Sequence, residues 1–275
     1  MPDSKPLSGQ VAIVTGASSG IGRAIAEHLG RAGAHTYLAG RTARLLEECK
    51  ASIEQEGGTA DTVVGDIRDI KQVQDLVNQA TAAKGRLDIM VNNAGLEFPA
   101  KIMDGDPENW RTMLETNVLG LLVGCQAAVN AMRACKAEGH IVNVSSVSAQ
   151  RNNSGVYGAT KHAVNVVSSS LRDELEEDSI RVTNVMPGAI ATNFARNFDR
   201  EFVNNIIKMA GMDIEVQEGE HLPPEVLERL QNKTRQLLGN PNDVARAVLY
   251  AVTQPIEVNI AEIVVRPPRS MNLAH

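Results

Sequence analysis

The amino-acid sequence predicts a single α/β domain, in which a doubly wound parallel sheet of about seven strands has helices on both faces. Three observations predict this fold. Short apolar runs alternate with helical patterns along the first two thirds of the 275 residues. The runs are continuous and rich in β-branched residues, as is typical of strands buried on both faces. No internal repeat or low-complexity linker divides the chain, so the alternation indicates right-handed crossovers within one domain.

The predicted elements follow one another in a regular order. The strands are VAIVTG, HTYLAG, DTVVGD, LDIMVNNAG, HIVNVSS, IRVTNVMPG and VNIAEIVVRP (11–16, 35–40, 61–66, 87–95, 140–146, 180–188 and 258–267). The best-defined helices cover 21–32, 42–55 and 243–253. The segment between Thr192 and Asp243 is too long for a plain connection in a compact domain, so it must carry structure of its own.

Composition excludes several classes of protein. The hydrophobic fraction is 43% and the aromatic fraction only 3%, so a large core must be built from Ala, Val, Ile and Leu. A net charge of −6 argues against nucleic-acid or anionic-membrane partners. Three cysteines without a C-x-x-C pair indicate neither a disulfide framework nor a metal site. With no apolar signal region and no apolar run that spans a bilayer, we expect a soluble, cytoplasmic protein.

Small and functional residues gather where the predicted strands end. In a parallel sheet of this kind, ligands bind outside the carboxyl ends of the strands. The residues at those ends are Thr15-Gly16, Gly40-Arg41, Gly65-Asp66, Asn92-Asn93-Ala94-Gly95, Ser145-Ser146 and Pro187-Gly188. The sequence therefore predicts one crevice that these strand ends share.

A glycine-rich turn lies between the first strand and the first helix. In TGASSGIGRA, Gly16, Gly20 and Gly22 allow a tight turn and a close approach of the backbone to a pyrophosphate on the helix N-terminus. Tight turns need glycine for other reasons too, but the strand–turn–helix context favours dinucleotide binding. We expect Ser18, Ser19 and Ile21, which lie between these glycines, to contact the dinucleotide as well.

The end of the second strand favours NADP(H) over NAD(H). An NAD site usually has an acidic residue there that binds the ribose 2′-hydroxyl. This chain has Gly40-Arg41 instead, with no carboxylate to repel a 2′-phosphate. The guanidinium of Arg41 can bind a phosphate with two charge-assisted hydrogen bonds. The alternative is that Arg41 is an ordinary residue at the start of a helix.

Tyr157 and Lys161 stand four residues apart in VYGATKHAV, with small residues between them. On a helix, positions i and i+4 lie on one face about 5–6 Å apart. A tyrosine needs its pKa lowered from about 10 to act at neutral pH. An ammonium about 6 Å away contributes about 2.8 kcal/mol at an effective dielectric constant of about 20, so Lys161 supplies part of that shift. For an isolated Y-x-x-x-K pattern, ordinary packing is the alternative.

These motifs occur in order, and together the chain resembles the classical short-chain dehydrogenase/reductase family from Gln10 to about Thr192 and again in the last strand. The resemblance implies a Rossmann-type fold, a core over 10–192, a helical substrate lid over 193–242, and a last helix, strand and tail over 243–275. The tail is similar to the branch of NADP-dependent 3-hydroxy-acid and serine 3-dehydrogenases. The family also implies a homodimer or homotetramer.

The resemblance implies a catalytic tetrad of Asn117, Ser146, Tyr157 and Lys161. Tyr157 would donate the proton in reduction and accept it in oxidation, Ser146 would bind the substrate oxygen, and Asn117 would position a relay water. Ser145 and Ser148 are rival serines. Ser146 stands 11 residues before Tyr157, a shorter spacing than is usual in the family.

Further cofactor contacts are implied by position in the family pattern. Asp66 and Ile67 would flank the adenine, although Asp66 is also suited to cap a helix. Lys161 would bind the nicotinamide ribose, and Thr192 the carboxamide. The remaining predicted contacts are Asn93, Ala94, Gly95, Tyr157, Pro187, Gly188 and Ile190.

The lid region carries three of the four phenylalanines in the chain, Phe194, Phe198 and Phe202, at helical spacing. With Phe98 and Ser148 they predict a mainly apolar substrate pocket, and core packing of a lid helix is the alternative. We therefore expect an NADP(H)-dependent oxidoreductase that interconverts a ketone or aldehyde and an alcohol. The alternatives are a non-catalytic NADP-binding sensor and an epimerase or dehydratase of the same family.

Overall fold

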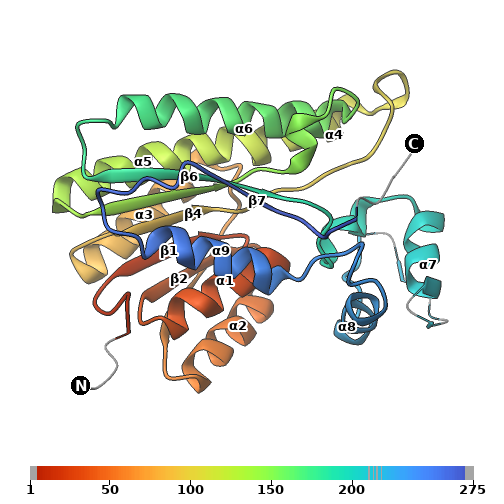
Figure 1. Cartoon of the computed structure of the whole chain (residues 1–275), viewed down its shortest axis with the longest axis horizontal. Coiled ribbons are helices and arrows are strands. Elements are labelled where there is room, and N and C mark those ends of the chain that lie inside the picture. Colours follow the sequence, from red (N-terminus) through yellow and green to blue (C-terminus); the bar gives the residue numbers. More distant parts are fainter. Residues whose placement is uncertain (1–4, 210, 213, 215, 218, 270–275) are drawn as a thin grey trace.

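The computed structural model describes residues 5–209, 211–212, 214, 216–217 and 219–269. Its centre is a parallel seven-stranded sheet in the order β3-β2-β1-β4-β5-β6-β7 (Figure 1). The strands are β1 (Val11–Thr15), β2 (His35–Gly40), β3 (Thr59–Val64), β4 (Ile89–Asn92), β5 (Gly139–Val144), β6 (Ile180–Pro187) and β7 (Glu262–Val265). The order reverses between β1 and β4, which creates the switch point at which such sheets bind ligands. The predicted doubly wound α/β fold is confirmed.

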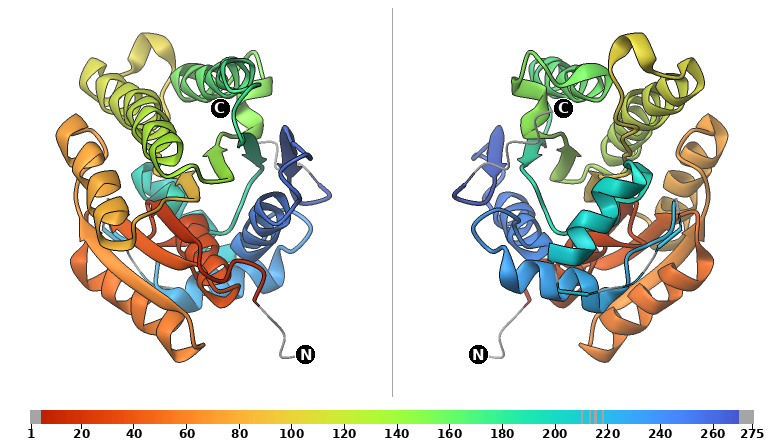
Figure 2. Two further views of the ribbon diagram at one scale, coloured as in Figure 1. Left: turned by 90° about the vertical axis from the view of Figure 1, so that its left-hand side faces the viewer. Right: turned by 90° about the vertical axis from the view of Figure 1, so that its right-hand side faces the viewer.

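Helices cover both faces of the sheet, as Figure 2 shows. One face packs against α1 (Gly20–Arg31), α2 (Ala43–Gln55) and α9 (Pro241–Val252). The other face packs against α3 (Ile70–Lys84), α5 (Gly120–Cys135) and α6 (Gly155–Glu174). Because aromatic residues are scarce, both cores consist mainly of Ala, Val, Ile and Leu.

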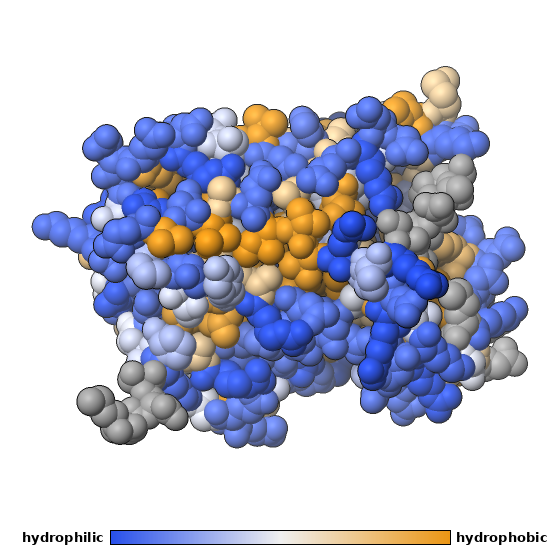
Figure 3. All heavy atoms as spheres, viewed as in Figure 1, coloured by the Kyte–Doolittle hydropathy of each residue, from blue (hydrophilic) through white to orange (hydrophobic). Residues whose placement is uncertain are grey.

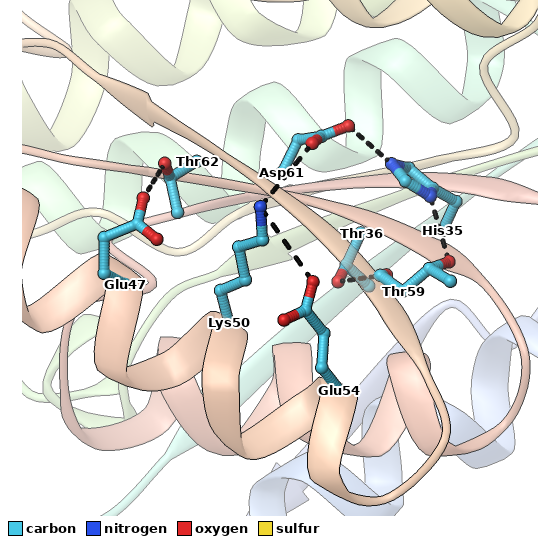
Figure 4. Close-up of polar contacts among 8 residues, drawn as sticks. All are labelled: His35, Thr36, Glu47, Lys50, Glu54, Thr59, Asp61 and Thr62. Carbon is cyan, nitrogen blue, oxygen red and sulfur yellow. Dashed lines mark hydrogen bonds and ion pairs between the residues drawn. The ribbon is translucent and has the colours of Figure 1, made fainter.

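The two edge strands differ from the inner ones. β1, β4 and β5 are buried along their whole length. In β3 only Ala60 is buried, and every residue of β7 is exposed or partly exposed. An edge strand has one neighbour and less cover, so the expectation that every strand is buried on both faces is wrong for these two. Figure 4 shows polar contacts that attach β3 to its surroundings, including the bond from Thr62 to Glu47 on α2 and the pair His35–Asp61.

One helical run among the described residues, Pro107–Cys135, is long and apolar enough to cross a membrane by length and composition. It comprises α4 (Pro107–Leu114), a π-helical segment (Glu115–Leu119) and α5. Within the fold, α5 packs against α3, β4 and β5. The run is therefore a covering helix of the sheet in this structure.

The lid region lies beyond the carboxyl ends of the strands, where Figure 1 places α7 and α8. It contains a short helical turn (Asn193–Asn197), α7 (Arg200–Met209) and α8 (Pro224–Lys233). These elements enclose a small apolar cluster of their own, centred on Ile207, Val226 and Leu230. Residues 210, 213, 215 and 218 of the predicted lid lie outside the described residues.

Candidate active site

A cavity of about 1680 Å³ opens at the carboxyl ends of the strands, between the sheet and the lid. Pockets for single small molecules usually measure about 300–1000 Å³, so this cavity has room for a dinucleotide and a second molecule. The structure brings all the predicted cofactor residues to its wall. They are Gly16, Ser18, Ser19, Gly20, Ile21, Gly22, Arg41, Asp66, Ile67, Asn93, Ala94, Gly95, Tyr157, Lys161, Pro187, Gly188, Ile190 and Thr192.

The glycine turn is shaped by steric limits. Gly16 and Gly20 have φ angles of 68° and 56°, in the left-handed region that favours glycine. A Cβ atom on Gly22 would lie 2.3 Å from the carbonyl oxygen of Gly16. The side-chain amide of Asn93 donates to the carbonyl oxygen of Thr15 at 2.9 Å. Asn93 thus fixes the glycine turn against the end of β4, a structural role in addition to its predicted contact with the cofactor.

The N-terminus of α1 faces this cavity without a competing side chain. Its N-cap residue, Ser19, makes no side-chain cap hydrogen bond, and no acidic residue lies in the first turn. The first N–H groups of a helix need acceptors and carry partial positive charge. This turn therefore fits the pyrophosphate of a dinucleotide.

Cationic side chains meet at the end of β2. Arg41 lines the cavity there, and Arg196 and His221 reach the same cavity from the lid. Burial lowers the pKa of Arg196, and the charge of Arg41 lowers it further. Burial also lowers the pKa of His221, followed by the charges of Arg196 and Arg44. Within the described residues, no carboxylate forms an ion pair with Arg41 or Arg196, although Asp66 is near enough for the charge of Arg41 to lower its pKa. The two guanidinium groups therefore fit a bound anion, and His221, whose pKa is lowered, adds a neutral hydrogen-bonding group.

Two hydrogen bonds fix the lid segments that carry Arg196 and His221. The N–H of Gly219 donates to the carbonyl oxygen of Arg196 at 3.1 Å. The N–H of Leu222, next to His221, donates to Oδ1 of Asn193 at 2.6 Å. These bonds join the segment that carries Arg196 to the segment that carries His221. The sequence alone does not indicate this role of Arg196, because only the folded lid brings it near Arg41.

Tyr157 and Lys161 lie side by side on α6, as the i, i+4 spacing predicted. Tyr157 is 8% exposed and Lys161 3%. Nζ of Lys161 lies 5.9 Å from the centre of the Tyr157 ring and donates to the carbonyl oxygen of Val144 at 2.9 Å. The small residues around the pair matter, because a Cβ atom on Gly95 would lie 3.2 Å from that Nζ.

Burial dominates the acid–base properties of this pair. It raises the pKa of Tyr157, the charge of Glu97 raises it further, and a hydrogen bond with Ser146 lowers it. It also lowers the pKa of Lys161 to about 8, against the opposing effect of Glu97. In the protein by itself, burial outweighs the partial lowering of the Tyr157 pKa that was expected from Lys161. Desolvation of both side chains is the larger effect.

Ser146 lies at the end of β5, lines the same cavity as Tyr157, and is near enough to lower the pKa of the tyrosine by hydrogen bonding. Its Oγ also accepts from the N–H of Ser148 at 3.1 Å. The rival Ser145 points into α6, where its hydroxyl donates to Oδ1 of Asn165 at 2.6 Å. Despite the short spacing to Tyr157, the geometry favours Ser146 over Ser145 as the serine beside the tyrosine.

Asn117 is buried in the π-helical segment and does not line the cavity. Its side chain accepts from the N–H of Leu96 and donates to the Leu96 carbonyl oxygen, both at 2.9 Å. It also donates to Oγ1 of Thr160 on α6 at 3.1 Å. Since these bonds use both amide atoms, Asn117 fixes the loop after β4 against the helix that carries Tyr157. π-Helical turns of this kind are frequent at functional sites.

Asp66 is engaged by an arginine. Its carboxylate accepts from Nε of Arg68 at 3.0 Å and pairs with the same guanidinium at 2.6 Å. This bond lowers the pKa of Asp66. The cap of α3 is Asp69, which accepts from the N–H of Lys71, so the helix-cap alternative for Asp66 is wrong.

The predicted substrate residues are divided. Phe194, Phe198, Phe202 and Ser148 line the cavity, and the Phe194 ring lies 5.5 Å from that of Tyr157. Phe98 does not line it, because it packs outside the wall against the apolar cluster around Tyr157. The three lid phenylalanines do not share a helix either: α7 begins only at Arg200, so the helical stripe is wrong.

Sequence reasoning missed Glu97, Arg44 and His221, which also line the cavity. Glu97 follows the Asn-Asn-Ala-Gly turn in the otherwise apolar stretch LEFP. A lone carboxylate in such a stretch was the available signal. Burial raises the pKa of Glu97 to about 7, although the charge of Lys161 acts in the opposite direction.

A glycine turn at the switch point, with a buried Tyr–Lys pair and a serine on the same cavity, defines a dinucleotide-dependent oxidoreductase of the α/β class. A sequence model described as short chain dehydrogenase matches residues 10–202. The chain belongs to the short-chain dehydrogenase/reductase family and is an oxidoreductase of that family.

Relatives and solved structures agree with this family. An uncharacterized oxidoreductase of Staphylococcus aureus strain USA300 is 33% identical over 95% of this chain and 98% of its own. The crystal structure of a metagenomic short-chain oxidoreductase in complex with NADP is 30% identical, with a TM-score of 0.73 over 95% of this chain and 98% of that chain. A short-chain type dehydrogenase/reductase from Mycobacterium marinum is 27% identical, with a TM-score of 0.79 over 96% of each chain.

Proposed function

We propose that the protein is an NADP(H)-dependent oxidoreductase that interconverts a ketone or aldehyde and the corresponding alcohol. The observation that carries this proposal is the buried pair of Tyr157 and Lys161, with Ser146 beside the tyrosine on the same cavity wall. All three line the same cavity as the glycine turn. A proton donor thus stands beside the place where a nicotinamide and a carbonyl compound can meet.

The chain's own residues handle the proton. A nicotinamide held beside Lys161 and Thr192 would supply hydride chemistry at the carbonyl carbon, in either direction. Ser146 binds the substrate oxygen and holds it near the Tyr157 hydroxyl, which donates its proton as negative charge develops on that oxygen. The Lys161 ammonium stabilises the tyrosinate that remains, by about 2.8 kcal/mol at about 6 Å and an effective dielectric constant of about 20.

The raised pKa of Tyr157 favours the protonated donor at neutral pH. Reduction can therefore begin from the resting state of the site. Oxidation requires the proton to leave first, which the positive charges of Lys161 and of an oxidised nicotinamide both assist. Asn117 is a positioning residue here, because its bonds keep the loop after β4 attached to α6.

A preference for NADP(H) over NAD(H) is supported by charge. Arg41 and Arg196 supply positive charge at the end of β2, and the imidazole of His221 lines the same cavity. The nearby carboxylate of Asp66 is paired with Arg68, which reduces its repulsion of a phosphate. A guanidinium binds phosphate through paired, charge-assisted hydrogen bonds, so the 2′-phosphate has a place among these cations.

The substrate side of the cavity favours a mainly apolar carbonyl compound. Phe194, Phe198 and Phe202 line it, and Ser148 adds a polar contact. We further propose that the protein acts in the cytoplasm as a homodimer or homotetramer, without nucleic-acid or membrane partners, in keeping with its net charge of −6.

Cofactor turnover separates this function from its alternatives. With NADPH and a panel of keto esters, 3-oxoacyl compounds and steroids, an oxidoreductase shows a steady fall in NADPH absorbance that depends on the ketone. A sensor binds NADPH without consuming it, and an epimerase or dehydratase converts substrate with no net loss of NADPH. Binding without consumption across the panel would contradict the proposed function.

A further inference from the structure

Glu97 is a carboxylic acid at the reaction centre to which the tetrad gives no role. It lines the cavity on the loop that follows β4. Its neighbour Leu96 is 7% exposed and packs with Tyr157. The backbone carbonyl oxygen of Glu97 accepts a hydrogen bond from Nδ2 of Asn197 in the lid at 3.3 Å. The loop that carries Glu97 is therefore held between the tyrosine and the lid.

The carboxylate of Glu97 has no hydrogen bond or ion pair within the described residues. Lys161 is the cation that acts on it electrostatically, yet the Lys161 ammonium donates to the carbonyl oxygen of Val144. A largely buried carboxylate without a donor is costly. Because Glu97 lines the cavity, its carboxylate is a strong hydrogen-bond acceptor that remains open to a ligand.

The surroundings of this acceptor are apolar. Leu96, Met113 and Tyr157 form a buried cluster, with Phe98 and Phe194 packed against it. In an apolar pocket, a few polar groups orient the ligand. A site built to hydrogen-bond a substrate group discriminates strongly against an analogue that lacks it, because the buried partner is then left unpaired.

We propose that Glu97 is a specificity-determining residue that selects carbonyl compounds, and the matching alcohols, that carry a hydroxyl or ammonium group within a few bonds of the reacting carbon. The inference rests on the proposed function and narrows its substrate class. The donor group of the substrate binds the Glu97 carboxylate while the carbonyl oxygen binds Ser146 and Tyr157. The apolar remainder of the substrate contacts Phe194 and the lid.

A different role for Glu97 gives a different pattern. If Glu97 only kept Lys161 charged, its removal would slow every substrate by a similar factor and would shift the pH profile of all of them. If it binds the substrate, its removal slows substrates with a donor group much more than substrates without one. The comparison of matched substrates therefore separates the two roles.

The test uses acetophenone and its derivatives with a hydroxyl or ammonium group on the α or β carbon, assayed with NADPH. Hydrogen bonds to a charged group are strong enough that Glu97→Gln should lower the ratio of kcat/KM for the donor-bearing ketones to kcat/KM for acetophenone about 10- to 100-fold. A change that all the ketones share reports the effect of the Glu97 charge on Tyr157 and Lys161. Glu97→Asp, which keeps the charge, should retain part of the preference. Glu108→Gln, which removes a carboxylate from the exposed surface of α4, is the matched control.

The outcomes separate this inference from the proposed function. NADPH affinity, measured by fluorescence, should be unchanged in Glu97→Gln, which shows that the variant is folded. Equal effects of Glu97→Gln on all the ketones, or no effect on any of them, would overturn the role of Glu97 and leave the oxidoreductase intact. Absence of NADPH consumption with every ketone would instead overturn the proposed function, and the inference with it.

Discussion

Tyr157 and Lys161 show how burial and charge compete at a single site. Each is more than nine-tenths buried, so desolvation moves both pKa values towards the neutral forms. The spacing of the two residues was readable from the sequence, but their depth was not. Depth depends on Leu96, Met113 and Phe194, which come from other parts of the chain.

Arg41 and Arg196 make the cofactor choice testable at the residue scale. Arg41→Ala and Arg196→Gln should each weaken NADPH binding, because each removes a cation from the proposed 2′-phosphate site. A charge-assisted contact contributes about 1.5–3 kcal/mol, or roughly 10- to 100-fold in the dissociation constant. NADH binding should change little. Fluorescence titration of both cofactors measures the effect.

Arg31→Ala is the matched control for these variants, since Arg31 pairs with Glu56 away from the cavity. If NADPH and NADH lose the same affinity in Arg41→Ala, then Arg41 has a structural role. A wild-type preference for NADH would reject the NADP(H) proposal altogether.

At the scale of elements, the sequence predicted best the bounds of the strands that are fully or mostly buried. The strands that became β1, β2 and β6 were found within one residue of their observed ends, because their apolar runs are continuous. Edge strand β3 begins at Thr59, two residues earlier than predicted, because Thr59 is polar and exposed and the small Ala60 gives only a weak apolar signal. The last strand was predicted over 258–267, but only Glu262–Val265 pair with β6.

Features that depend on tertiary contact could not be predicted. The π-helical segment around Asn117 has no distinct sequence pattern. Its role depends on the hydrogen bonds of Asn117 to Leu96 and Thr160, which only the folded chain brings together. The same holds for the lid, where a regular spacing of phenylalanines suggested one helix. The chain instead forms a short turn before α7, so that Phe194 packs on Tyr157.

His140, near the start of β5, gives an element-scale prediction about pH. It is 7% exposed, and burial, followed by the charge of Arg181, lowers its pKa from 6.5 to about 4. Between these two values the unfolded chain binds more protons than the folded one, so the free energy of unfolding falls as the pH falls. His140→Gln should therefore lose less stability between about pH 7 and pH 5 than the wild type does.

Urea denaturation at the two pH values measures this difference. His28→Gln, the same replacement on α1, should behave like the wild type. An equal loss of stability in the wild type and in His140→Gln would show that His140 does not contribute to acid sensitivity.

At the scale of the whole molecule, one edge of the sheet is apolar and open. β7 has a single partner strand, and Val264 on β7 and Val258 just before it are 47% and 42% exposed. Figure 3 shows an apolar band across this face, along β7. Exposed apolar edges favour association with another chain. This edge is therefore where the proposed homo-oligomer has its best candidate contact.

A charged residue placed on this apolar edge tests the assembly. Light scattering should give a mass of more than one chain for the wild type, and Val264→Lys should shift it towards the monomer. Val64→Lys is the matched control, because Val64 is 58% exposed on β3 at the opposite edge of the same sheet. A monomeric wild type, or the same shift in both variants, would contradict assembly through β7.

The central claim is that Tyr157 transfers the proton in a carbonyl–alcohol reaction that uses NADP(H). Its most direct test is the Tyr157→Phe variant, assayed for NADPH consumption with a ketone that the wild type reduces, and for NADPH affinity by fluorescence. General acid catalysis contributes about 10²- to 10⁴-fold, so turnover should fall below about one per cent of the wild type. NADPH should still bind, because only the hydroxyl group is lost. Turnover that stays above about one per cent with NADPH bound would contradict the account.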